Sequence, residues 1–376
     1  MPPAGSSITL LSPAELSFLH TSLTSTPPVR PDLRTPTQFR PLVAETGILP
    51  STNGSARICF SDGTEAIVGI KAELEKTPQA PSSFGFGRQD DDNDKDMNED
   101  FVSLNTNTAA PTTHLDISIS LPSHRDDDPL PTFLSSMLTE TLLASPTLAQ
   151  KLHINARWHW RLGIDVLLLS PPLSYPLPLL SLTTHLALLN TALPRLKSEE
   201  EDDPMFDDDW GAAVLLYGEG GAGKKGMEMR EEKPPITLLV MTAGGNVIFD
   251  PSREELAVAD AVIAVTVAAT NSPEAPLRVL AVRMVDPPSR LTPPGVPDVS
   301  NPNTAVGGAA AAGQGQKGNE KEKSGTTAVT EAEKAKVWTP PRGGIRRDLV
   351  ARVVKMVVEK GGVGEEVLAG LAGVET

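Results

Sequence analysis

The sequence predicts an α+β protein built from two halves, each a β-sheet accompanied by helices. Apolar runs of strand length occur on both sides of an acidic stretch at 199–209, and longer segments with apolar residues at helical spacing accompany them. The composition adds a third observation. With 35 prolines, 30 glycines and only 4% aromatic residues among 376, part of the length is predicted to be linker rather than packed structure.

The first half is predicted to begin with a short helix and to continue as an antiparallel sheet. Ser12, Pro13 and Glu15 form the pattern of a capped helix start, and this helix is expected to end near Ser22. The turn residues SDG at 61–63, between two apolar runs, indicate a hairpin. The strands expected in this half are 42–47, 56–60, 65–74, 114–121 and 158–170, and the further helices are 133–143 and 179–193.

The second half repeats this pattern with its own strands and a closing helix. Residues AGGN at 243–246 indicate a hairpin turn, and 254–258 is expected to be a short connector, either helical or extended. The strands expected here are 212–217, 236–241, 247–249, 262–268 and 277–284. A helix from about 345 to 359, ended by two glycines, is expected to close the chain.

The predicted domain organisation follows from these elements and from the composition between them. The expected segments are an N-terminal helix in 1–24, a first half in 25–196 with an insertion at 76–113, an acidic linker at 197–211, a second half in 212–286 with an insertion at 218–233, a low-complexity linker at 287–340, and a C-terminal helix of the second half in 341–376.

The negative charge of the chain is concentrated in two segments. Residues 89–100 and 199–209 carry −6 and −8 of the formal net charge of −15, so the rest of the chain stands at −1. Their composition is typical of disorder. The nearly neutral remainder lacks the strong positive field expected of an autonomous RNA-binding protein.

Composition also excludes several classes of protein and site. A single cysteine, Cys59, excludes a disulfide framework and a thiolate zinc site, and six histidines that do not cluster in sequence give no reason to expect a metal. No cofactor is predicted. The N-terminal residues do not resemble a signal peptide and no apolar run reaches about 18 residues, so a soluble, intracellular protein without membrane contact is expected.

Two short motifs suggest nucleotide or nucleic-acid binding and have simpler interpretations. Residues 218–225 (GEGGAGKK) match G-x-x-x-x-G-K, but Lys225 stands where the phosphate-binding loop needs a hydroxyl group, and two prolines follow before any helix of useful length. An inserted hairpin loop is therefore favoured. Trp158-His159-Trp160, flanked by arginines, could stack on single-stranded nucleic acid, but a strand entering the core is the preferred interpretation.

Three stretches together resemble the RNase PH family, and in particular its ring subunits in the eukaryotic RNA exosome. The first, 29–74, contains R-x-D-x-R, F-R-P, and G-S-A before a paired strand that leads to G-x-K. The others are IDVLLL at 164–169 and PPITLLVMTAGGNVIFD at 234–250. The resemblance implies the RNase PH fold, with two βαβ-type halves, and a place in a hetero-hexameric ring around an RNA channel, with cap subunits, associated ribonucleases and RNA as partners. It also implies a nuclear, nucleolar and cytoplasmic location.

The resemblance also implies that this chain is not a catalyst. Active members degrade RNA from its 3′ end by phosphate attack, and their strand aspartate is followed five positions later by a second aspartate and two glycines. Here Asp165 is followed by Ser170, Pro171 and Pro172. The segment 132–146, where active members carry arginines, contains no basic residue. No catalytic residue is therefore predicted, and Asp165 is expected to be a structural strand residue. A non-catalytic scaffold is favoured over two alternatives, an active phosphorolytic 3′-exoribonuclease and a stand-alone RNA-binding module.

The same resemblance selects the candidate site residues. Arg125 is the candidate for contact with the RNA path, and its alternative is pairing with the aspartates that follow it. Structural ion pairs or subunit interfaces are expected for Arg30, Asp32, Arg34 and Arg40. Leu33 stands where the family usually has glycine, so the local turn is expected to differ there.

Overall fold

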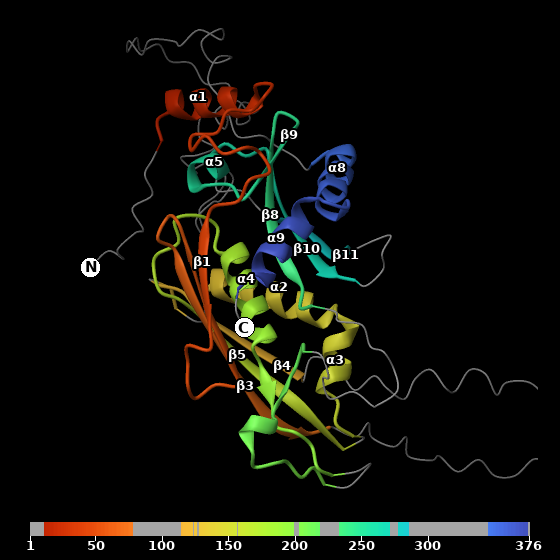
Figure 1. Ribbon diagram of the computed structural model, residues 1–376. Helices are drawn as coiled ribbons and strands as arrows, with labels where there is room; N and C mark the ends of the chain where they lie inside the picture. Colours follow the sequence, from red (N-terminus) through yellow and green to blue (C-terminus); the bar gives the residue numbers. More distant parts are fainter. Residues whose placement is uncertain are drawn as a thin grey trace, which may run out of the picture.

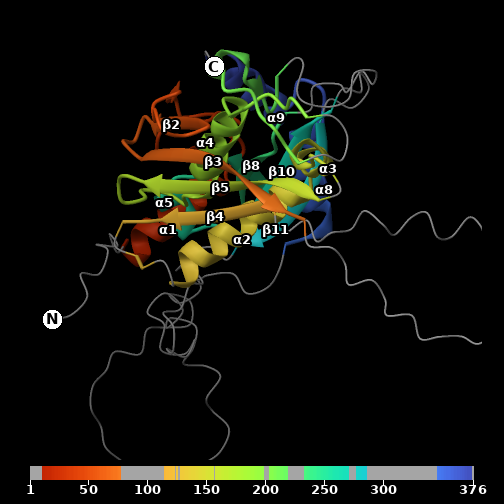
Figure 2. The same ribbon diagram turned by 90° about the horizontal axis from the view of Figure 1, so that it is seen from below.

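Two β-sheets with helices between them form the framework of the protein (Figures 1 and 2). The structure is a computed structural model and describes residues 11–77, 114–122, 124–125, 128–155, 157–198, 203–218, 233–270, 277–285 and 345–374. The insertion centred on 89–100, most of that at 218–233 and the linker at 287–340 lie outside these residues.

The first sheet has five strands in the order β1-β2-β3-β5-β4. β1 (Leu42–Thr46), β2 (Gly54–Phe60), β3 (Glu65–Lys76) and β5 (Trp158–Leu168) pair in antiparallel fashion, whereas β4 (Leu115–Ser120) runs parallel to β5. The predicted hairpin between β2 and β3 is confirmed, and Gly63 adopts a φ of +83° in its turn. β4 alternates between buried and exposed side chains, so one face of the sheet packs inward.

Helices α2 (Pro129–Leu143), α3 (Pro146–Leu152) and α4 (Leu177–Leu189) cover the inner face of this sheet. α2 and α3 connect the parallel strands β4 and β5, which makes this part a β-α-β unit. α4 packs against β2 and β3 on one side and against β8 (Ile236–Ala243) of the second sheet on the other. All but the last of its residues are buried, and its polar side chains, Ser181, Thr183, Thr184 and His185, each form a hydrogen bond.

The second sheet has four strands in the order β11-β10-β8-β9, and all pairings among them are antiparallel. β9 (Asn246–Phe249), α5 (Arg253–Ala257), β10 (Ala261–Ala269) and β11 (Leu277–Val285) follow β8 along the chain. The predicted AGGN turn joins β8 to β9, and both of its glycines have positive φ values. Among the described residues the parallel β-α-β connection is thus confined to the first half.

Helices at both ends of the chain pack on the second sheet. The capping box predicted for the first helix is present in α1 (Pro13–Thr24), and Asn246 donates to the carbonyl oxygens of Leu23 and Ser25 at the end of that helix. α8 (Arg347–Val358) buries Val353 and Val357 and lies beside β11. No helix among the described ranges combines the length and the apolar character that a membrane span needs.

The structure corrects the predicted elements at four places. α3 was not predicted, because its few apolar residues do not make a helical period. The helix predicted at 179–193 ends at Leu189, and Ala192–Leu193 form the short strand β6. The strand predicted at 212–217 is a 3-10 turn, Trp210–Ala212, followed by the two-residue strand β7 (Val214–Leu215). The single C-terminal helix is two helices, since α9 (Val363–Ala372) follows α8 after Gly361, whose φ is +73°.

Candidate functional site

The candidate site lies where the parallel strands β4 and β5 end. Ser120 stands opposite Leu167 in their register, so the loop before α2 and the loop before α4 leave the sheet at the same edge. In sheets with parallel strands, this edge is where ligands usually bind. Arg125 lies in the first loop and Ser170, Pro171 and Pro172 lie in the second.

Asp165 and Ser170 are both engaged in contacts within the sheet. Asp165 is on the exposed face of β5 and accepts a hydrogen bond of 2.6 Å from Ser118 Oγ on β4. Ser170 Oγ accepts from the backbone N–H of Glu65 at 3.0 Å and donates to the carbonyl oxygen of Gly63 at 3.2 Å. Ser170 therefore fastens the β2–β3 hairpin, and its hydroxyl both accepts and donates a hydrogen bond there.

The helix beside this edge offers no positive charge. The exposed side chains of α2 are Pro129, Thr132, Phe133, Ser136 and Glu140, and Glu140 forms an ion pair with Arg283 of β11. Arg125 is exposed, and its backbone N–H donates to the carboxylate of Asp128 at 3.0 Å. This contact orders the loop without using the guanidinium group, so the side chain of Arg125 faces solvent at the correct edge of the sheet for a contact with a polyanion.

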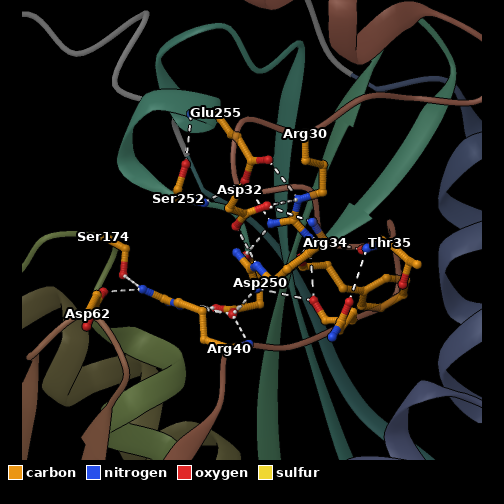
Figure 3. A network of polar contacts seen from close by, with 12 residues as sticks. Arg30, Asp32, Arg34, Thr35, Arg40, Asp62, Ser174, Asp250, Ser252 and Glu255 are labelled. Carbon is orange, nitrogen blue, oxygen red and sulfur yellow. Dashed lines mark hydrogen bonds and ion pairs between the residues drawn. The ribbon is translucent and has the colours of Figure 1, made fainter.

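Arg40 also lies near this edge, but carboxylates occupy its guanidinium group (Figure 3). Its Nε and Nη2 donate to Asp250, with Nη2 to Oδ1 at 2.6 Å, and its Nη1 donates to Asp62 at 2.5 Å and to Ser174 Oγ at 3.0 Å. The group also stacks on the ring of Phe60, 4.7 Å from its centroid. Because its side chain is only 9% exposed and each of its three nitrogens donates to Asp250, Asp62 or Ser174, Arg40 is a structural link rather than a free phosphate-binding group.

Arg30 forms the deepest ion pair of this network (Figure 3). It is 1% exposed and binds Glu255 with two hydrogen bonds, Nε to Oε1 at 2.8 Å and Nη2 to Oε2 at 2.9 Å. The remaining donors reach backbone carbonyl oxygens, including those of Phe249 and Asp250. The geometry is the paired fork expected of arginine and carboxylate, and it joins the segment before β1 to α5 of the second half.

Arg34 and Asp32 complete the network, with Arg34 largely buried and Asp32 at the surface. Arg34 donates to Asp32 at 2.5 Å and to Asp250 Oδ2 at 2.8 Å. Leu33 between them has a φ of +61°, so it keeps the left-handed turn that suits glycine despite its side chain, which is 85% exposed. The structure thus brings Arg30, Asp32, Arg34 and Arg40 together and leaves Arg125 apart.

Asp250 and Glu255 are the members of the network that the sequence did not single out. Burial alone would raise the pKa of Asp250, but the hydrogen bonds and charge of Arg40, together with Arg34, hold that pKa below its usual range. The pKa of Arg40 is raised, since Asp250 and Asp62 outweigh the effect of burial. Ser252 and Glu255 form a capping box at the start of α5. Its S-x-x-E pattern is present in the sequence and could have drawn attention to Glu255.

The aromatic residues at the start of β5 do not form an open platform. Trp160 is buried and packs on Phe206, with ring centroids 5.1 Å apart. Trp158 is half-buried; Lys76 lies over its ring at 5.2 Å, and its Nε1 donates to Asp203 at 3.3 Å. Trp160 is therefore not available for stacking on bases, and Lys76 lies over the ring of Trp158. The glycine-rich motif lies, from 219 onward, outside the described residues.

Comparison with known proteins identifies the family to which this chain belongs. The family model for RNase PH, described as the 3′ exoribonuclease family, domain 1, matches residues 38–194. The exosome complex component RRP42 of Saccharomyces cerevisiae is 30% identical over 256 residues, which span 66% of this chain and 78% of that protein. The chain belongs to the 3′ exoribonuclease family. The exosome complex component rrp42 of Schizosaccharomyces pombe is 28% identical over 277 residues, or 70% of this chain and 80% of that protein.

Solved structures of modest similarity include chains from two archaeal exosomes. An archaeal exosome core chain has a TM-score of 0.48 and 18% identity, covering 73% of this chain and 85% of that chain. An Archaeoglobus fulgidus exosome with RNA bound to the active site has a TM-score of 0.47 and 18% identity, covering 72% and 87%. The RNase PH match ends at 194, close to the end of the first half, so the five-stranded sheet, α2, α3 and α4 make up the RNase PH domain of this chain.

Proposed function

We propose that this chain is a structural, non-catalytic subunit of the core ring of the RNA exosome. In this role it supports 3′-to-5′ processing and degradation of RNA, including ribosomal RNA maturation and messenger RNA turnover, by shaping the ring and its channel. The observation that carries the proposal is its similarity to two yeast proteins named as exosome components, over more than three quarters of their lengths. Its partners are other RNase PH-like subunits, cap subunits and associated ribonucleases, in the nucleus, nucleolus and cytoplasm.

The residues at the edge of the sheet where β5 ends support the absence of catalysis. Phosphorolysis needs groups that bind inorganic phosphate and cations that hold the RNA backbone at the same place. At this edge the hydroxyl of Ser170 is used by the β2–β3 hairpin and the guanidinium of Arg40 is used by Asp250 and Asp62. Proline at 171 and 172 offers no amide hydrogen, and α2 exposes no basic side chain. Arg125 is the remaining candidate for contact with RNA there.

The assembly is tested by purifying the tagged chain from its own cells. The expected result is a particle in which this chain and other RNase PH-like subunits occur in equal amounts. A chain that elutes alone near its own mass of 39.8 kDa would contradict the scaffold role. Replacement of Arg125 by alanine should leave the composition of the particle unchanged and weaken RNA binding by the assembled ring.

Catalysis is tested separately with the isolated chain. Incubation with single-stranded RNA and inorganic phosphate should release no nucleoside diphosphate, because the anion-binding groups at the end of β5 are occupied. Release that depends on phosphate and is lost in Asp165→Asn would instead support the active exoribonuclease. Tight binding of RNA by the isolated chain, with a steep dependence on salt, would support a stand-alone RNA-binding module.

A further inference from the structure

Three buried polar atoms at the far end of the first sheet have no hydrogen-bond partner. They are Oε2 of Glu75 on β3, Nδ1 of His114 just before β4, and Nε2 of His159 on β5. Unpaired buried polar groups are rare and costly, so three of them in one place require an explanation. They lie at the opposite end of β5 from the candidate site, and the proposed function does not use them.

The two imidazole rings are stacked on each other. The ring centroids of His114 and His159 are 4.4 Å apart at an interplanar angle of 30°, and the two residues are 8% and 1% exposed. Nε2 of His159 is 3.9 Å from Oε2 of Glu75. Histidine and carboxylate are common metal ligands, but no group of three or more such side chains in the described ranges could hold a metal ion. A metal ion therefore does not explain the unpaired atoms in this cluster, whereas each of them can bind a proton.

His159 contacts both chain stretches that flank residues 78–113. Nδ1 of His159 lies 3.0 Å from Oγ1 of Thr77, the first residue after β3, and the backbone N–H of Thr77 donates to the carbonyl oxygen of Arg157. His114, the last residue before β4, is held against β5 by the ring stack. One imidazole thus connects the end of β3 with the beginning of β4.

Charges around the pair decide how many protons it can hold. From β3, Glu75 faces the rings; from β5, Arg161 reaches Glu75 at 3.9 Å and Asp116 of β4 at 2.8 Å; and His153, after α3, lies beside both rings. A proton on His159 would be favoured by Thr77 Oγ1, 3.0 Å from Nδ1, and by the charge of Glu75, whose carboxylate is 3.9 Å from Nε2. A second proton on His114 would then lie in a ring stacked on a cation, which is unfavourable.

We propose that the stack of His114 on His159 is a proton-sensitive clasp, which holds the end of β3 and the beginning of β4 against β5 near neutral pH and releases His114 in acid. Burial lowers the pKa of His114, and both His159 and His153 act in the same direction. Burial likewise lowers the pKa of His159, against the opposing charge of Glu75. Since both pKa values lie below the ordinary 6.5, the contact is fully present above pH 6.5 and is lost as the pH falls through the lowered values.

Hydrogen exchange on the full chain, followed by mass spectrometry at pH 7.5 and 5.5, tests the clasp. After correction for the intrinsic pH dependence of exchange, amides in 70–77 and 114–120 should lose protection in acid. Below pH 6.5 the protection factor of these amides should fall by up to about tenfold per pH unit for each proton that is bound only when the stack has opened. Glu75→Gln removes the charge that opposes the lowering of the His159 pKa, so the protection lost between pH 7.5 and 5.5 should be larger than in the unmodified chain.

Two variants separate titration of the clasp from a general effect of acid. His114→Phe keeps an aromatic ring in the stack and removes one of the two proton sites, so the loss of protection between the two pH values should be clearly smaller than in the unmodified chain. His124→Gln, in the exposed loop before α2, should keep the response of the unmodified chain. Equal loss of protection in His114→Phe, or no loss in the unmodified chain, overturns the proposal. If His114→Phe does not fold, histidine ring signals in the NMR spectrum decide, since both rings titrating at ordinary values also overturns it.

Discussion

At the scale of single residues, Asp250 carries the largest concentration of contacts between the two halves. Its carboxylate accepts from the backbone and side chain of Arg40 and from Arg34, and only 3% of its side chain is exposed. Its φ of +47° is a conformation that asparagine adopts readily. An Asp250→Asn substitution therefore removes the charge without adding backbone strain.

We expect Asp250→Asn to lower the free energy of unfolding by about 3–5 kcal/mol, because it leaves two largely buried guanidinium groups without their main counter-charge. Urea denaturation followed by circular dichroism measures the change. Asp62→Asn is the matched control: it removes one contact of Arg40 at a side chain that is 23% exposed, and its cost should be clearly smaller. Equal costs for the two variants would contradict the central position of Asp250.

Sequence patterns predicted the contacts that form within a few residues and missed those that form across the fold. The capping box of Ser12 with Glu15 and the turn at Gly63 each involve residues close together in the sequence, so the local residue types predict them. The partner of Arg30 is Glu255, 225 positions away, and nothing local to either residue indicates the pairing. The resemblance selected the arginines and Asp32, whereas Asp250 and Glu255 became visible as partners only in three dimensions.

At the scale of elements, α4 is the helix that both sheets share. Predicting where it ends from apolar spacing failed because the apolar pattern continues through Ala192 and Leu193, which instead form β6. His185 of α4 is fully buried, and its Nδ1 hydrogen-bonds to the carbonyl oxygen of Pro234, just before β8. Burial lowers the pKa of His185 to about 4, so the imidazole is neutral in the folded protein near neutral pH.

The stability of the protein should therefore fall between pH 6.5 and 4. The unfolded chain binds a proton at His185 below pH 6.5, whereas the folded chain binds it only near pH 4, so the contribution is complete above 6.5 and lost at 4. The expected loss is about 3 kcal/mol, since one pKa unit corresponds to about 1.4 kcal/mol. His185→Asn keeps an N–H donor that does not titrate. Denaturation across this range should give it a shallower slope, and an unchanged slope would contradict the assignment.

Contact between β2 and the end of α4 requires a glycine. A Cβ at Gly54 would lie 2.3 Å from Oγ1 of Thr191 and 2.7 Å from the carbonyl oxygen of Ala187, so the backbone would have to move. We expect Gly54→Ala to lower the melting temperature, with a cost of about 1–3 kcal/mol. Gly370→Ala in α9 is the control: nothing lies within 4 Å of its added Cβ, and alanine should stabilise that helix by up to about 1 kcal/mol.

At the scale of the whole molecule, the two halves behave as one unit because two buried connections join them. α4 packs between the sheets, and the network around Arg30 and Asp250 ties the segment before β1 to β9 and α5. Arg30, Asp32, Arg34 and Arg40 were expected to form structural ion pairs or subunit interfaces, and the contacts they make lie within the chain. Arg30 is too deeply buried to reach a neighbouring subunit, but its pairing with Glu255 joins the two halves of the chain.

A double-mutant cycle measures that connection. Arg30→Met leaves Glu255 buried without a counter-charge, and Glu255→Met does the same to Arg30, so each should cost about 3–5 kcal/mol in urea denaturation. The double variant should cost less than the sum of the single costs by about 1–3 kcal/mol, because the second change removes a charge that the first had stranded. Every variant that folds should still unfold in one transition, since α4 continues to couple the sheets. Strictly additive costs would mean that the pair does not act as a unit, and two separate transitions would mean that the halves are held together chiefly by Arg30 and Glu255.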